Sequence, residues 1–343
     1  MKILRIVFLL ALLASPAVDA LHAGAGNRRG TGGATELLIP VGARDIGMGG
    51  STISTTHGIE ALFWNPAGVA RMNGSVSLML SHMAYIADIG VEYGAVAAQF
   101  RDFGVVAFSI KSLTVGAIDV TTTQNPDGTG QTFTPQFLTA GLSYSRQLSD
   151  RVAVGATVNL ISERLGDVST TGYSFNAGVI YENLGDVPGL SLGVVVKNIG
   201  PQMEFDGPGL YRLATVNDQN RPSQYYKIDS APFELPSTLE FGLGYRSSLA
   251  GQTSLLISST FQNNNFAGDE YKVGAELAYA NLLYVRAGYS MSPKAQDDDY
   301  LYGFTAGAGL TYEVGDVTIG IDYAYRAVKY FDANNIFSIK LGF

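Results

Sequence analysis

The sequence of 343 residues contains no cysteine, only three histidines and few charged residues. The lack of cysteine excludes disulfides, thiol catalysis and zinc–thiolate sites. Charged side chains make up 15% of the chain and the formal net charge is −8, which argues against nucleic acid binding. After the N-terminal segment, no stretch reaches the roughly eighteen consecutive apolar residues of a membrane-spanning helix.

Apolar and small residues are nevertheless abundant. Hydrophobic residues make up 46% of the chain, which also holds 41 glycines, 19 tyrosines and 17 phenylalanines. A high apolar content without long apolar runs is typical of membrane β-strands, because only alternate residues of such a strand contact lipid.

The N-terminus has the pattern of a cleavable export signal. Lys2 and Arg5 precede the apolar run Ile6 to Leu13, and small residues follow at Val18-Asp19-Ala20. The run is too short to span a bilayer. We expect a signal peptide over residues 1–20, cut after Ala20 or alternatively after Ala17. The absence of cysteine excludes a lipoprotein signal.

The last ten residues alternate between apolar and polar side chains. Phe337, Ile339, Leu341 and Phe343 share one face of a strand, opposite Ser338, Lys340 and Gly342. A terminal apolar strand ending in phenylalanine, on a chain with an export signal, is typical of the closing strand of a bacterial outer-membrane barrel. The sequence therefore predicts that the protein lies in the cell outer membrane of a Gram-negative-type bacterium, with lipid and lipopolysaccharide around the barrel.

Similar alternation recurs along residues 74–343, where short and long connections also alternate as in an up-and-down barrel. We predict an all-β, transmembrane, antiparallel barrel that is monomeric and has fourteen strands; misreading one hairpin would make the number twelve or sixteen. The predicted strands are Ser75–Tyr85, Val91–Phe100, Gly104–Ser112, Gln136–Gln147, Arg151–Glu163, Thr171–Asn183, Leu190–Ile199, Leu235–Ser247, Gln252–Gln262, Glu270–Tyr279, Leu282–Met291, Tyr300–Glu313, Asp316–Lys329 and Asn334–Phe343.

The two faces of these strands predict lipid outside and a polar lumen inside. From Tyr302 to Tyr312, for example, one parity is aromatic and apolar, and the other is glycine and threonine. Tyrosines eight to ten residues apart would lie roughly 21 to 26 Å apart along the membrane normal, which matches two aromatic girdles. The predicted lumenal charges either pair with one another and with a plug, which we favour, or line a solute path. They are Glu182, Glu240, Arg246, Lys272, Glu276, Arg286, Glu313, Asp322, Arg326 and Lys340.

Residues 21–73 do not have the strand pattern. After a Gly- and Arg-rich lead come Gly42-Ala43-Arg44-Asp45-Ile46-Gly47-Met48-Gly49-Gly50 and then Trp64-Asn65-Pro66-Ala67-Gly68. Asn65 before Pro66 predicts a capped helical turn. A segment that is neither strand nor linker, placed before a barrel, suggests a hatch inside the lumen.

These two motifs resemble the start of the PorV/PorQ family of outer-membrane proteins. The Asn-Pro-Ala-Gly element is also similar to that of FadL-type long-chain fatty-acid transporters, which are fourteen-stranded barrels with an N-terminal hatch. The resemblance implies hatch roles for Asn65, Pro66 and Ala67. PorV-type members serve type IX protein secretion and bind the C-terminal signal of exported cargo, whereas FadL members pass hydrophobic molecules to the lipid phase.

The longest predicted external loop, Gly200–Glu234, is rich in aromatic residues. Ordinary loops are shorter than about a dozen residues, so we expect either a structural lid or a partner-binding surface. The candidate partner-binding residues are Phe205, Tyr211, Tyr225 and Tyr226.

No motif indicates catalysis, a cofactor or a metal. Ser51 and His57 lack a third partner, His22 lies in the lead, and His82 is expected near the outer end of the first strand. Asp297-Asp298-Asp299 reads as a solvated acidic loop because it lacks an ordered ligand spacing. The sequence thus predicts a non-enzymatic barrel. The PorV/PorQ resemblance implies that it acts in type IX secretion or surface delivery, with secretion components and cargo signal domains as partners. The alternative is FadL-like uptake of hydrophobic small molecules.

Overall fold

The computed structural model describes residues 30–215, 222–293 and 300–343. The expected signal peptide, His22 and the acidic run Asp297–Asp299 lie outside these residues. In the described ranges, no helix has the length and apolar character needed to cross a membrane.

Fourteen strands in the described part of the chain form one closed antiparallel barrel, in which β1 pairs with both β2 and β18. All fourteen predicted strands are found, most within three residues of their expected ends. The barrel strands are β1 (Val76–Ala84), β2 (Gly90–Phe100), β3 (Gly104–Thr114), β6 (Gln136–Gln147), β7 (Val152–Leu165), β8 (Val168–Glu182), β9 (Leu190–Ile199), β12 (Thr238–Ser248), β13 (Thr253–Asn264), β14 (Glu270–Tyr279), β15 (Leu283–Met291), β16 (Tyr302–Val314), β17 (Val317–Val328) and β18 (Asn334–Gly342).

The strand pattern places apolar side chains outside and polar ones inside. In β15, the side chains of Val285 and Tyr289 are 64% and 50% exposed, whereas Arg286 and Ser290, of opposite parity, are buried. A water-soluble barrel would have the reverse arrangement, so the exterior is suited to lipid.

The predicted alternation of inward and outward side chains is wrong at the outer end of β16. The register between β16 and β17 shifts between Tyr302 and Thr305, which is a β-bulge that turns the first residue of β16 inward. The Tyr302 hydroxyl lies 2.6 Å from that of Tyr85, inside the barrel mouth. Tyr302 therefore does not belong to the outer aromatic girdle, which the Tyr302–Tyr312 spacing had suggested.

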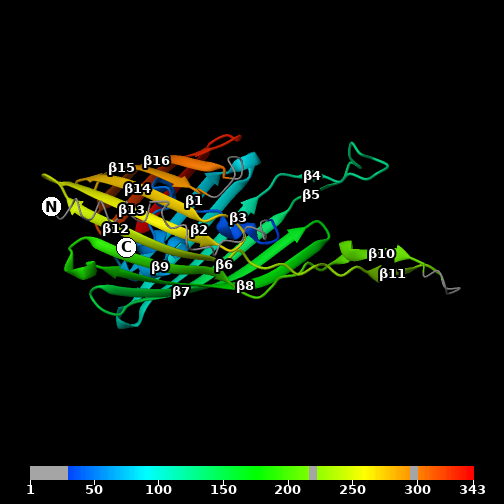
Figure 1. Cartoon of the computed structure of the whole chain (residues 1–343), viewed down its shortest axis with the longest axis horizontal. Helices are drawn as coiled ribbons and strands as arrows, with labels where there is room; N and C mark the ends of the chain where they lie inside the picture. Colours follow the sequence, from blue (N-terminus) through cyan, green and yellow to red (C-terminus); the bar gives the residue numbers. More distant parts are fainter. Residues whose placement is uncertain (1–29, 216–221, 294–299) are drawn as a thin grey trace.

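The two ends of the barrel differ in their connections. Short turns, including η5 (Arg101–Phe103) and η6 (Leu184–Asp186), lie at the end that holds the C-terminus, which is the periplasmic end in barrels of this kind. At the other end, β4 (Ile118–Asp119) pairs with β5 (Thr132–Phe133), and β10 (Tyr211–Ala214) pairs with β11 (Gln224–Lys227). Figure 1 shows both hairpins projecting well beyond the barrel, on the side opposite the C-terminus. Neither hairpin was expected from the sequence, in which both segments have the pattern of loops. The outer end also carries η4 (Ile86–Asp88) and η7 (Pro208–Leu210).

Residues 30–73, which we call the plug segment, pack inside the barrel. Its elements are η1 (Thr35–Leu38), α2 (Ala43–Gly47), η2 (Gly58–Glu60), α3 (Ala61–Trp64) and η3 (Pro66–Arg71). Helix α2 packs on β15 to β18, whereas η3 packs on β3, β6, β7 and β8 on the other side of the barrel. The segment therefore bridges opposite walls of the lumen.

The C-terminal residue takes part in closing the barrel. The Phe343 amide donates to Val76 O at 2.9 Å, and the Ser75 amide donates to Phe343 O at 2.5 Å. We expect deletion of Leu341–Phe343 to leave the β1–β18 seam open and the protein degraded in the periplasm. Replacing Thr121–Gly130 of the projecting β4–β5 connection with a short Gly/Ser linker serves as the control and should not change outer-membrane levels. Normal levels of the truncated chain in membrane fractions would contradict this.

Candidate functional site

The Asn-Pro-Ala element anchors the plug segment to the barrel wall. The Asn65 amide nitrogen donates to Ile53 O at 2.8 Å, and its side-chain oxygen accepts from the Ala67 amide, which confirms the predicted cap. Ser145 Oγ of β6 donates to Pro66 O at 2.6 Å. A side chain at Gly178 of β8 would collide with Asn65, so glycine is required there for the close approach. The predicted hatch residues are therefore buried anchors of the segment.

A ring of alternating charges joins the other half of the plug segment to the opposite wall. Arg44 Nε lies 3.1 Å from Glu276 Oε2, and Lys340 Nζ lies 2.9 Å from Glu60 Oε1. Three further ion pairs and a longer Arg44–Glu60 approach of 3.9 Å complete the ring. In order, its members are Arg44, Glu276, Arg286, Asp322, Lys340 and Glu60. The expected pairing of lumenal charges is confirmed here.

Asp45 lies beside this ring with no exposed surface. Its carboxylate is 3.4 Å from Arg44 Nη1 and 3.5 Å from the Thr56 hydroxyl. Burial raises the pKa of the Asp45 carboxyl above its usual range, and Glu60 acts in the same direction while Arg44 opposes it. The three cations of the ring are already matched by its three carboxylates, so no surplus cation lies next to Asp45.

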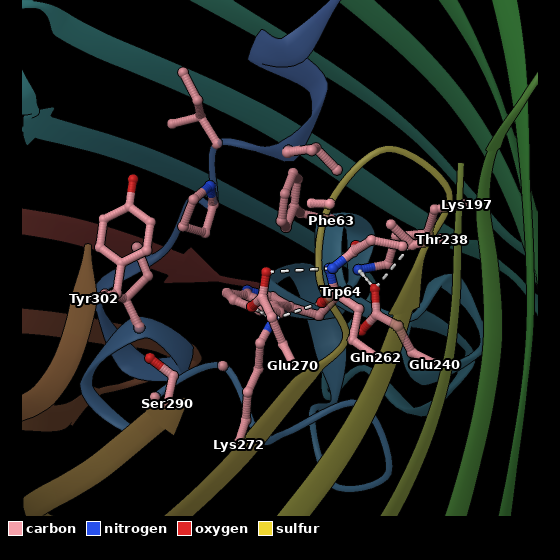
Figure 2. A pocket seen from close by; sticks show the side chains of 18 of the residues that line it. Phe63, Trp64, Lys197, Thr238, Glu240, Gln262, Glu270, Lys272, Ser290 and Tyr302 are labelled. Carbon is pink, nitrogen blue, oxygen red and sulfur yellow. Dashed lines mark hydrogen bonds and ion pairs between the residues drawn. The ribbon is translucent and has the colours of Figure 1, made fainter. Parts of the chain in front are cut away.

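A cavity of about 290 Å³ lies between the plug segment and the outer half of the wall, and we call it the outer cavity. Its volume is near the lower end of the range of about 300–1,000 Å³ that is usual for small-molecule sites. The plug segment supplies apolar and aromatic side chains, notably Leu37, Ile39, Phe63 and Trp64. Figure 2 shows Phe63 and Trp64 close to the polar side chains of the surrounding strands. The outer cavity is therefore amphipathic.

The strands contribute the polar side of the outer cavity. Lys197 Nζ of β9 lies 2.8 Å from Glu240 Oε1 of β12. Lys272 Nζ of β14 lies 2.5 Å from Gln262 Oε1 and 3.2 Å from Glu270 Oε2. Lys197 and Lys272 thus have carboxylate partners, whereas Arg326, the third cation of the lining, contacts aromatic rings, and the wall offers a ligand both donors and acceptors.

Aromatic and cationic groups complete the mouth of the outer cavity. The Arg326 guanidinium lies 4.0 Å from the centre of the Tyr302 ring, which the bulge in β16 has turned inward. The Tyr300 hydroxyl donates to Glu270 Oε2 at 3.3 Å. Burial raises the pKa of both Tyr85 and Tyr300, so their hydroxyls stay protonated at neutral pH. The mouth thus combines aromatic faces with neutral hydrogen-bond donors.

The candidate partner-binding residues do not gather at this cavity. Phe205 packs on Phe233 at the base of the long loop, with ring centres 5.6 Å apart. Tyr211, Tyr225 and Tyr226 lie on the projecting β10–β11 hairpin with side chains 47%, 73% and 42% exposed. The base of the loop packs on the start of the plug segment, where the Gly33 amide donates to Glu234 O at 3.1 Å, and the β10–β11 hairpin stands away from the barrel (Figure 1).

His57, His82 and Ser51 also lie outside the outer cavity and away from one another. Ser51 Oγ is 2.7 Å from Ser258 Oγ, and His57 Nε2 lies 3.0 Å from Glu182 Oε1 at the periplasmic end. His82 faces outward from β1 and lies 2.6 Å from Glu92 of β2. Within the described ranges, no group of three or more histidine or acidic side chains is arranged to hold a metal ion.

Sequence reasoning missed several buried lumenal charges, notably Lys111, Glu163 and Lys197. Lys111 Nζ donates to Glu36 O and Ile39 O of the plug segment at 2.8 and 3.2 Å. The inward parity of these residues was available in the sequence. By contrast, Glu313, which was predicted to be lumenal, lies exposed near the periplasmic end of β16.

The sequence matches no family model and none of the curated proteins. Solved structures do resemble it. A FadL homologue from Pseudomonas aeruginosa superposes with a TM-score of 0.55 at 13% identity, over 88% of this chain and 98% of that one. The Ralstonia pickettii toluene transporter TbuX gives 0.55 at 14% identity, over 89% and 98% of the chains. The monoaromatic hydrocarbon channel CymD gives 0.54 at 14% identity, over 89% and 97%.

These likenesses confirm the fourteen-stranded fold of FadL-type outer-membrane channels. With its apolar exterior, the barrel lies in the outer membrane, as predicted. The similar structures are described as channels and transporters and not as enzymes. The PorV/PorQ resemblance has no counterpart among these comparisons.

The plug segment should limit conductance through the barrel. Deleting Arg44–Arg71 removes two members of the charge ring and the Asn65 anchor, so we expect a large open channel in planar lipid bilayers. The intact protein should conduct little. Folding of the deletion variant is checked by heat-modifiable migration on gels. Equal conductance of the two folded proteins would show that the segment does not obstruct the lumen.

Proposed function

We propose that this protein is an outer-membrane channel for the uptake of small hydrophobic molecules that carry a polar group. The observation that carries the proposal is the outer cavity, which has an apolar side made by the plug segment and a polar side made by β9 and β12 to β14. The fold of toluene and monoaromatic hydrocarbon channels supports it. Uptake was the alternative reading of the sequence, and the geometry favours it over protein secretion.

The polar wall narrows the class of solute. A bare hydrocarbon would leave Lys272, Glu270 and Gln262 without water or a partner for their remaining hydrogen-bonding capacity. A hydroxyl group can both donate to and accept from such a wall. An aromatic or short aliphatic body would pack on Phe63 and Trp64. We therefore propose a small alcohol or phenol-like solute in preference to toluene itself.

Trp64 allows a direct test, because it is the only tryptophan in the chain and lines the outer cavity. We expect its fluorescence in the detergent-solubilised protein to respond to benzyl alcohol at several-fold lower concentration than to toluene. Lys272→Met should abolish this preference, since it removes the wall donor nearest to Gln262 Oε1. The exposed Lys227→Met on the outer hairpin is the matched control and should behave as wild type. Identical responses to the two solutes in all three proteins would contradict the proposal.

A second candidate function rests on the β10–β11 hairpin. Its aromatic side chains are exposed far from the lipid band, although burying each is worth about 1.5–3 kcal/mol. Such a surface favours a protein partner, as the PorV/PorQ resemblance implies for secreted cargo with a C-terminal signal domain.

Replacing Gly207–Ser230 with a short Gly/Ser linker separates the two functions. If the hairpin binds cargo, the variant should keep normal heat-modifiable migration and lose its association with secreted proteins. Replacing Thr121–Gly130 in the β4–β5 connection provides a matched loop control. If secreted proteins still copurify with the Gly207–Ser230 variant, the hairpin is not a cargo site.

A further inference from the structure

A second cavity of about 240 Å³ lies at the periplasmic end of the lumen, on the far side of the plug segment from the outer cavity. We call it the inner cavity. It is lined by Ser54, Thr55 and His57 of the plug segment, by Glu182 at the end of β8, by Leu190 and by residues including Arg246 and Leu256 of β12 and β13. None of these residues takes part in the outer cavity or in the charge ring.

Among the described residues, Glu182 is the only carboxylate in this lining, and its charge is already neutralised. Glu182 Oε2 lies 2.8 Å from Arg71 Nη1, and Glu182 Oε1 lies 3.0 Å from His57 Nε2. Arg71 is fixed further, because its Nη2 donates to Asp150 O at 3.2 Å. Each carboxylate oxygen of Glu182 therefore already has a partner, and Glu182 does not pair with a further cation of the cavity.

Arg246, an exposed residue that lines the cavity, supplies a second positive charge that has no such partner. Its backbone amide donates to Gly189 O at 2.9 Å, which fixes its place near the end of β12. Among the described residues, its guanidinium has neither an ion pair nor a hydrogen-bond acceptor; Glu276 and Glu182 attract it and Arg44 repels it only at longer range. Arg71 and Arg246 are two positive charges and Glu182 is one negative charge. The inner cavity therefore carries a surplus positive charge even when His57 is neutral.

One further feature defines what this charge can bind. Leu190 and Leu256 give the same cavity an apolar wall. A guanidinium presents a planar fork of donors that matches the geometry of carboxylate and phosphate. An anionic group on a short apolar body complements both the charge and the apolar wall.

We propose that the inner cavity is a binding site for a small organic anion, held through its carboxylate or phosphate group by the Arg246 guanidinium. The site is separate from the outer cavity, so it does not require the proposed uptake function. It lies where a solute passing the plug segment would leave the barrel. An anion bound there would also hold the turn Asn183–Gly189 against β12.

The test is calorimetric titration of the full-length protein in a non-ionic detergent at low salt, with acetate, butyrate and inorganic phosphate as probes. Butyrate should bind, and Arg246→Gln should weaken binding about tenfold to a hundredfold, the usual effect of losing a charged hydrogen bond. Arg246→Lys should give an intermediate loss, because it keeps the charge without the fork. Heat-modifiable migration verifies that each variant is folded.

Arg151→Gln is the matched control, since it removes the same charge at the same end of the barrel from a residue already paired with Asp186 at 2.5 Å. It should bind butyrate as wild type does. Tighter binding of butyrate than acetate supports an amphiphilic anion, and equal binding of acetate and phosphate supports a free anion. Undiminished binding by Arg246→Gln, or an equal loss in Arg151→Gln, would overturn the site. So would a butyrate-dependent change in Trp64 fluorescence, which reports on the outer cavity.

Discussion

The ring of six alternating charges is the constraint on which the interior of the barrel depends. Charges taken out of water are costly unless each finds partners with good geometry. Four members come from the wall strands β14, β15, β17 and β18, and only Arg44 and Glu60 of the plug segment close the ring. The four wall charges sum to zero, but Glu276 and Lys340, at the two ends of the row, each lack one ion-pair partner until Arg44 and Glu60 are in place. The two therefore specify each other's position, and any movement of α2 away from the β14–β18 wall must break ion pairs at this ring.

The opposite wall is held in a different manner, by close backbone approach. Gly155 and Gly178 leave room for Pro66 and Asn65, where any side chain would collide with them. The Asn-Pro-Ala element that carries the family resemblance is consequently an architectural device. It seats the segment inside the barrel, and its residues line neither the outer nor the inner cavity. This explains why the motif points equally to FadL-type and PorV-type proteins, while the choice between functions rests on the cavities and the outer loops.

Much of the barrel could be predicted from the sequence because a period of two is a local property. β6, β9 and β14 have the predicted bounds, since their alternation is uninterrupted. The features that could not be predicted depend on contacts between segments that are distant in the sequence. The bulge that turns Tyr302 inward is set by the register against β17, and the charge ring joins Arg44 to residues more than two hundred positions away. The β10–β11 hairpin was missed because strands of four residues have too little pattern to separate from a loop.

The two cavities differ in electrostatics, and this difference bears on how a solute would cross. In the outer cavity, Lys197 and Lys272 have carboxylate partners and the Arg326 guanidinium lies over the rings of Tyr85 and Tyr302, so a neutral molecule with one polar group loses little on entering. In the inner cavity, Arg246 lacks such a partner, so an anion gains most there. The seated plug segment separates them, anchored by the charge ring on one wall and by Asn65 on the other. A solute that entered at the outer cavity would therefore reach the inner one only after part of the plug segment had moved. The Asn65 anchor consists of neutral hydrogen bonds, whereas the ring consists of ion pairs. The part of the plug segment around η3 can therefore move away from its wall while α2 stays fixed to β14–β18.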